Sequence, residues 1–213
     1  MRFWLVLLLL SLSFSARSER KNVNLKDGAF FAYFTGGVSF TSSKAGDIPG
    51  AIFSSTLTNP YTLNAGIGVR LLNPFYFGLR LQNWIGKQEY GYQGQSYADT
   101  LTLQAFGGEF GMRFGNPRMQ YWFIGSIMCP SYLKMVRSGG ADTDFRLEKM
   151  PYYYEARVLI SLKMNYWLSF LVEGGYRQMN LGNLIGNGTS FIPSGENLNL
   201  SGPFGSVGIG FHF

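Results

Sequence analysis

The chain has 213 residues, enough for one domain, and although 46% of them are hydrophobic its mean hydropathy is only +0.02. The formal net charge is +6, but the basic residues are spread along the chain, so we expect no nucleic-acid partner. The single cysteine, Cys129, excludes an internal disulfide and supports no metal site. We therefore expect no cofactor.

The first residues have the three parts of a secretory signal. Arg2 precedes an apolar run over residues 3–10, and small residues follow it. The run is too short to span a bilayer as a helix, and no cysteine follows it as a lipid-anchor site. We predict a signal peptide over residues 1–15, with cleavage as late as residue 18, and a periplasmic tail over residues 16–28.

The clearest pattern in the remaining chain is period-two alternation between residues 152 and 177. Such alternation predicts strands with two unlike faces. Two strands around a short turn at residues 164–166 make a hairpin. Its apolar face carries these residues: Tyr152, Tyr154, Ala156, Val158, Ile160, Leu162, Leu168, Phe170, Val172, Gly174 and Tyr176.

The same pattern predicts eight strands in all, at residues 29–41, 61–71, 75–82, 100–114, 119–128, 152–163, 168–177 and 200–213. The pattern of the fourth strand slips at Ala105 and Phe106, as a β-bulge would require. The fifth strand is ambiguous because Trp122, Ile124 and Met128 interrupt its polar face.

The predicted connections alternate between short turns and long loops. The loops cover residues 42–59, 84–99, 130–150 and 178–199. An even strand number with short turns on one side and long loops on the other is typical of bacterial outer-membrane barrels. A secreted β-sandwich, the competing interpretation, has no reason to separate its connections in this way. We predict an all-β fold, a membrane-spanning, eight-stranded, antiparallel up-and-down barrel over residues 29–213.

The end of the chain resembles the C-terminal insertion signal of outer-membrane barrel proteins, through Ser206, Gly208, Phe211 and Phe213. The rest resembles the small OmpA/OmpX-type barrels by pattern only. The resemblance implies the outer membrane of a Gram-negative-type bacterium, contact with its lipid and lipopolysaccharide, and recognition by the barrel-assembly machinery.

The charged face of such a barrel must point into the lumen, since a basic side chain at the bilayer midplane costs about 2–4 kcal/mol. We expect ion pairs between Arg157 and Glu173 and between Arg80 and Glu109, with Gly68 and Gly78 leaving room for the arginines. The predicted lumen charge cluster is Arg70, Arg80, Glu109, Arg113, Glu155, Arg157, Lys163, Glu173 and Arg177.

An eight-stranded interior is only just wide enough for side chains, so we expect a closed lumen and a structural or adhesive role through four extracellular loops, which could bind an external ligand. The alternative is a narrow, OmpW-like channel for small or hydrophobic solutes. A lipid-modifying enzyme is a third class. We expect no enzyme, because the only histidine, His212, is about 20 Å from the inward-facing Ser206 along the strand.

Overall fold

The computed structural model describes residues 29–41, 52–53, 58–72, 74–138, 143–147, 151–181, 184–186 and 199–213. The expected signal peptide and periplasmic tail lie outside these residues. Within them, no helix is long and apolar enough to cross a membrane.

The described chain forms one antiparallel sheet of eleven strands. The strands are β1 (Phe30–Ser39), β2 (Ile52–Phe53), β3 (Thr58–Leu72), β4 (Phe75–Tyr92), β5 (Gln95–Gly115), β6 (Met119–Ser138), β7 (Thr143–Leu147), β8 (Tyr153–Lys163), β9 (Leu168–Gln178), β10 (Leu184–Gly186) and β11 (Gly202–His212).

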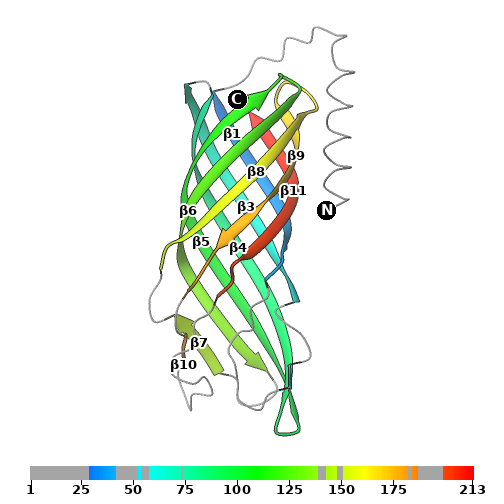
Figure 1. Cartoon of the computed structure of the whole chain (residues 1–213), viewed down its shortest axis with the longest axis vertical. Helices are drawn as coiled ribbons and strands as arrows, with labels where there is room; N and C mark the ends of the chain where they lie inside the picture. Colours follow the sequence, from blue (N-terminus) through cyan, green and yellow to red (C-terminus); the bar gives the residue numbers. More distant parts are fainter. Residues whose placement is uncertain are drawn as a thin grey trace.

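Eight of these strands close into a ring (Figure 1). Each pairs with the next in the order β1, β3, β4, β5, β6, β8, β9 and β11, and β11 pairs back with β1. The backbone N–H of Phe30 donates to the carbonyl of Phe213, which closes the seam at 3.1 Å. The predicted eight-stranded antiparallel barrel is confirmed.

The two ends of the barrel differ. The β3–β4, β5–β6 and β8–β9 connections lie at one end, the short-turn end, together with Phe30 and Phe213. The opposite, long-connection end carries the short strands β2, β7 and β10, and there the β4–β5 hairpin projects furthest, at the bottom of Figure 1. This separation of short and long connections agrees with the sequence analysis.

An apolar belt surrounds the outside of the ring, because alternate residues of every strand point away from the lumen. Leu79 and Leu81, for example, are 67% and 63% exposed. Other members of the belt are Phe30, Phe34, Leu63, Ile67, Phe75, Phe77, Phe106, Phe110, Phe114, Phe123, Ile127, Tyr154, Val158, Phe170, Tyr176, Val207, Ile209 and Phe213. Exposed apolar surface of this extent requires a lipid environment.

The predicted loop from Trp84 to Asp99 is wrong. β4 and β5 continue far beyond the apolar belt and meet at a two-residue turn, Gln93 and Gly94, with φ of 50° and 77°. Two successive positive φ values are those of a type I′ turn, whose twist matches a β-hairpin. In the same way β6 continues to Ser138, into the predicted loop that starts at Pro130.

An irregularity exists next to the predicted bulge at Ala105 and Phe106, but its extra residue belongs to the partner strand β6 and not to β5. β5 keeps its register parity throughout, with Leu101, Leu103 and Ala105 facing inward and Phe106 facing outward. The apolar residues change face because the strand leaves the membrane: lipid lies outside the belt, whereas water surrounds the extension. The irregularity lies in the partner strand, where Gln104 pairs with Tyr132 and Ala105 pairs with Pro130.

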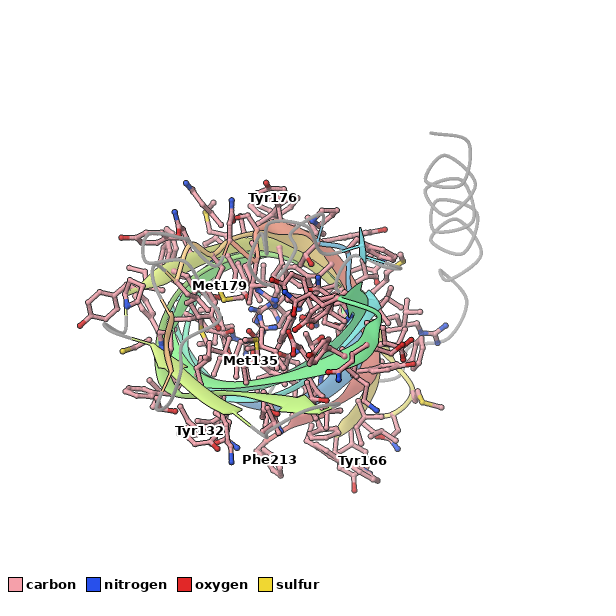
Figure 2. The ribbon with its side chains drawn as sticks, turned by 90° about the horizontal axis from the view of Figure 1, so that it is seen from below. Tyr132, Met135, Tyr166, Tyr176, Met179 and Phe213 are labelled. Carbon is pink, nitrogen blue, oxygen red and sulfur yellow. The ribbon has the colours of Figure 1, made fainter. Side chains whose placement is uncertain are left out.

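The lumen face of β6 is partly apolar, which explains the ambiguity of this strand in the sequence. Trp122, Ile124 and Met128 all point inward and are buried. Figure 2 shows the interior of the ring filled with side chains, with Met135 and Met179 inside and Tyr132, Tyr166, Tyr176 and Phe213 projecting outward.

Candidate functional site in the barrel lumen

Six charged side chains meet in the middle of the lumen, and none is more than 4% exposed. They point inward because each occupies an inward position of the alternation in β4, β5, β8 or β9. We call this group the charged layer: Arg80, Glu109, Glu155, Arg157, Glu173 and Arg177. Three arginines face three glutamates, so the charges of the layer balance.

Arg157 bridges two carboxylates. Its Nη2 lies 2.6 Å from Oε1 of Glu109, and its Nε lies 3.1 Å from Oε2 of Glu173. The Arg157–Glu173 pair expected from the hairpin register is therefore present. The partner across the ladder from Arg157 is Gly175, which leaves space for the side chain to lean toward Glu173.

Arg80 lies among all three carboxylates. Its Nη1 is 3.0 Å from Oε2 of Glu155 and 3.8 Å from Oε1 of Glu109, and its Nη2 is 3.7 Å from Oε1 of Glu173. The expected Arg80–Glu109 pair is present, but the shortest contact of Arg80 is with Glu155. Arg177 completes the layer through its Nε, 2.5 Å from Oε1 of Glu155.

Neutral side chains complete the network. Tyr33 donates to Glu109 and Thr35 donates to Glu173, each at 2.8 Å. Gln82 donates to Oε1 of Glu155 at 3.2 Å and accepts a 2.8 Å hydrogen bond from the hydroxyl of Tyr153. Further members are Asn64, Tyr76, Ser126 and Ser206, of which Ser206 donates to Glu173.

Sequence analysis missed these neutral partners. The alternation of β1 places Tyr33 on the same inward face as Thr35, so its orientation was predictable. Its hydrogen bond to a carboxylate was not, because an aromatic residue on a polar face does not indicate such a partner. The guanidinium carbon of Arg157 lies 5.6 Å from the centroid of the Tyr33 ring, which adds a cation–π contact.

Gly68 and Gly78 make room for Tyr76, rather than for Arg80 and Arg70 as expected. A Cβ on Gly66 would lie 2.2 Å from the ring of Tyr33, and one on Gly68 would lie 2.3 Å from the ring of Tyr76. The bare backbone thus gives the aromatic rings a flat surface inside the narrow barrel.

The other three members of the predicted lumen cluster lie near the short-turn end. Arg70, Arg113 and Lys163 also occupy inward positions, but they are half-buried. The guanidinium carbon of Arg113 lies 6.0 Å from the ring centroid of Trp122. The structure therefore divides the predicted cluster into a central layer and a group near the mouth.

Apolar side chains fill the lumen on both sides of the charged layer, as the inward positions Tyr76, Arg80 and Trp84 of β4 show in order. The short-turn cluster contains Phe31, Tyr33, Tyr76, Trp122, Ile124, Leu159 and Leu171. The long-connection cluster contains Trp84, Leu101, Leu103, Ala105, Met128, Leu133, Met135, Tyr153, Met179, Leu181 and Leu200. Ionised groups are thus held between two packed apolar layers.

His212 has a serine partner that the sequence did not indicate. Its Nε2 lies 2.6 Å from Oγ of Ser169, and its ring centroid lies 4.9 Å from that of Phe31. Ser169 is fully buried. A hydroxyl without access to solvent or lipid cannot attack a substrate, so the contact has the geometry of a packed pair rather than of a nucleophile. Among the described residues, no group of histidine, cysteine and acidic side chains has metal-binding geometry.

The predicted insertion signal occupies β11 and the residue after it. Ser206 and Gly208 face the lumen, where a Cβ on Gly208 would lie 2.0 Å from the carbonyl oxygen of Phe34. Phe211 and Phe213 face outward, and Phe213 is 69% exposed. The geometry of this strand is that of an amphipathic wall of the barrel.

A closed ring with an apolar belt outside and paired charges inside is a transmembrane β-barrel. Its fold is that of the small outer-membrane barrels. The crystal structure of Neisserial surface protein A (NspA) matches with a TM-score of 0.53 and 11% identity, over 88% of this chain and 99% of NspA. At this identity the likeness shows the fold alone.

Two other solved structures resemble the chain less closely in shape. OprG, an outer-membrane protein of Pseudomonas aeruginosa, matches with a TM-score of 0.49 and 11% identity over 88% of this chain and 97% of OprG. Outer membrane protein W of E. coli matches with a TM-score of 0.46 and 13% identity, over 88% of this chain and 99% of that protein. No family model matches the chain, and no curated protein matches it in sequence.

Proposed function

We propose that this protein is an integral barrel of the outer membrane of a Gram-negative-type bacterium. The short-turn end faces the periplasm, and the β4–β5 hairpin and the other connections of the opposite end lie outside the cell. The apolar belt supports the membrane location, and the separation of short from long connections supports the orientation, since outer-membrane barrels keep short turns on the periplasmic side. The barrel-assembly machinery recognises β11 during insertion.

The role that we propose is structural or adhesive, with a closed lumen. One observation carries it: the lumen is filled by three layers, of which the outer two are apolar and the middle one is ion-paired. An ion would have to break the charge pairs and also pass apolar packing on both sides. The barrel then acts as a rigid support for the connections that it displays.

The β4–β5 hairpin is the part of this support that extends furthest (Figure 1). The rings of Tyr90 and Tyr97 stack across it with centroids 5.4 Å apart, and residues 90–98 contain no charged side chain. Tyr90 is buried and holds the ring of Tyr97, while the partly exposed Tyr92 and Tyr97 offer contact area at a low entropic cost. We propose that the hairpin tip takes part in binding an extracellular ligand.

The experiment that tests closure is single-channel recording of the refolded full chain in planar bilayers. We expect no conductance steps, because buried apolar clusters lie on both sides of the charged layer. Steady conductance from the native chain would contradict the proposal and favour the alternative of a narrow channel. Insertion is checked separately by protease protection, so that silence cannot result from an empty bilayer.

Adhesion is tested on cells that carry the protein at their surface. Replacing Tyr92 and Tyr97 by alanine should reduce attachment to host cells or matrix while surface abundance stays the same. Lys163→Ala, at the opposite end of the barrel, is the control. Equal attachment by all variants would leave a purely structural role. Activity toward lipopolysaccharide or phospholipid that disappears with Ser169→Ala would instead favour the enzyme class.

A further inference from the structure

The apolar belt is not evenly filled, and one of its grooves has a polar end. A groove of about 460 Å³ lies on the outer face of β3, β4 and β5. Its floor is backbone at Gly66, Arg80 and Gly107. Its sides are the exposed apolar side chains Ile67, Leu79, Leu81 and Phe106. We call it the β3–β5 groove.

The β3–β5 groove continues toward the long-connection end into a second hollow of about 300 Å³. The two hollows share Ala65 and Leu81. The second one adds the polar side chains of Asn83, Gln104 and Ser131. The groove is therefore apolar at the depth of acyl chains and polar where β5 leaves the membrane, between Phe106 and Gln104.

Two observations indicate that the polar end is suited to a ligand. Oδ1 of Asn83 is buried and has no hydrogen-bond partner among the described residues, although a buried acceptor normally has one. Ser131 is the extra residue of the β6 irregularity, and its hydroxyl donates to the carbonyl of Gln104 at 3.3 Å. Bulges commonly redirect a side chain toward a site.

Basic side chains stand just beyond this polar row. Lys87 of β4 pairs with Thr100, and Lys134 of β6 pairs with Thr102, so the two lysines lie on either side of β5. Strands two apart are separated by roughly 10 Å. Two cations at this spacing match a head group that carries two separated phosphates better than one with a single phosphate.

We propose that the β3–β5 groove is a binding site for a phosphorylated, N-acylated glycolipid of the outer leaflet, the chemistry of lipid A. One acyl chain lies between Leu79, Leu81 and Phe106. On binding, the Asn83 side chain turns its Oδ1 toward the hollow and accepts a hydrogen bond from an amide or hydroxyl of the sugar. The phosphates lie near Lys87 and Lys134. The inference rests on the proposed outer-membrane location but not on the closed lumen or the adhesive role.

The barrel carries a matched control on another part of its circumference. A groove of about 470 Å³ lies on β5, β6, β8 and β9, and its outward-facing side chains are all apolar or absent. These are Phe110, Met112, Phe123, Gly125, Ala156, Val158 and Gly174. It offers similar space for an acyl chain without a polar row at its end.

The test is native mass spectrometry of the refolded full chain in detergent, titrated with lipid A and, separately, with phosphatidylglycerol. We expect lipid A to bind more tightly. Ala65→Leu, which fills the junction of the two hollows, should weaken lipid A binding by about tenfold. Ala156→Leu, in the control groove, should leave it unchanged. Both substitutions add apolar surface toward lipid and are compatible with folding.

The polar end is tested with the Lys87→Gln and Lys134→Gln double variant. It should bind lipid A more weakly, and its affinity should depend less on salt than that of the native chain. Equal losses from Ala65→Leu and Ala156→Leu, or equal affinities for the two lipids, would mean unspecific solvation of the belt and would overturn the proposal. Channel recordings and attachment assays report on the proposed function independently of these results.

Discussion

At the scale of single residues, the charged layer is held together by mutual compensation. Arg157 contacts two carboxylates, and Arg80 contacts three. Pairing offsets the desolvation of buried charges, so the layer need not stabilise the barrel relative to an apolar filling. Removing one partner is different, because it leaves the opposite charge buried and uncompensated.

Arg157→Ala should therefore lower the free energy of unfolding by about 3–5 kcal/mol, because Glu109 and Glu173 both lose their closest cation. Urea unfolding from lipid vesicles, followed by tryptophan fluorescence, measures the change. Lys87→Ala, at an exposed position, is the control and should change stability by less than about 1 kcal/mol. Similar losses for both variants would contradict the importance of the layer.

The second prediction at this scale concerns the packing of the Tyr76 ring against Gly68. Gly68→Ala places a methyl group where the ring now lies, 2.3 Å from its nearest atom, and should cost about 1–3 kcal/mol. Gly108→Ala is the matched control, because it points outward and would meet nothing within 4 Å. The same unfolding experiment compares the two. A neutral Gly68→Ala would show that Tyr76 can move aside.

At the scale of elements, the extension of β4, β5 and β6 beyond the belt is the feature that could not be predicted from the sequence. Alternation predicted every strand of the ring and the lipid-facing residues of the belt. Within the belt one rule applies, since apolar residues face the lipid outside and polar residues face the lumen. Beyond the belt the rule reverses, and Leu101 and Leu103 face inward while Thr100 and Thr102 face water. A reversal in one regular strand has the same pattern as a bulge.

The candidate site was predictable to the same degree. The six charged residues of the layer could be found because each lies on the polar face of an alternating strand, and the hairpin register placed Arg157 near Glu173. The contact of Arg80 with Glu155 was not predictable, since it crosses the lumen between strands that are not neighbours. The pairing of His212 with Ser169 joins the neighbouring strands β9 and β11, and it depends on their exact register, which the alternation alone does not give.

The tip of the β4–β5 hairpin permits a test of this element. Gln93 and Gly94 both have positive φ, which asparagine tolerates better than glutamine and which strains a β-branched residue. Gln93→Asn should therefore protect the tip from proteolysis, and Gly94→Val should expose it. Limited proteolysis of intact cells, read by cleavage within residues 90–98, is the measurement. Equal cleavage rates would mean that the turn does not limit opening of the hairpin.

At the scale of the whole molecule, each of the three layers of the lumen blocks the passage of ions independently of the others. The short-turn and long-connection clusters remain when the charged layer is damaged, and both are almost fully buried. Arg157→Ala should thus be unstable but still silent in planar bilayers. Conductance from this variant, with the native chain silent, would show that the ion pairs alone block the lumen.

The seam between β1 and β11 has a consequence for biosynthesis. These strands are the first and the last of the ring in chain order, yet they pair along nine residue positions, from Phe31 with His212 to Ser39 with Phe204. Until β11 has been made, the edge amides of β1 and β9 have no partners, and lipid offers none. A truncated chain that lacks β11 therefore cannot insert stably into the bilayer, and it stays accessible to chaperones and proteases. The seam thus makes completeness of the chain a condition for membrane residence.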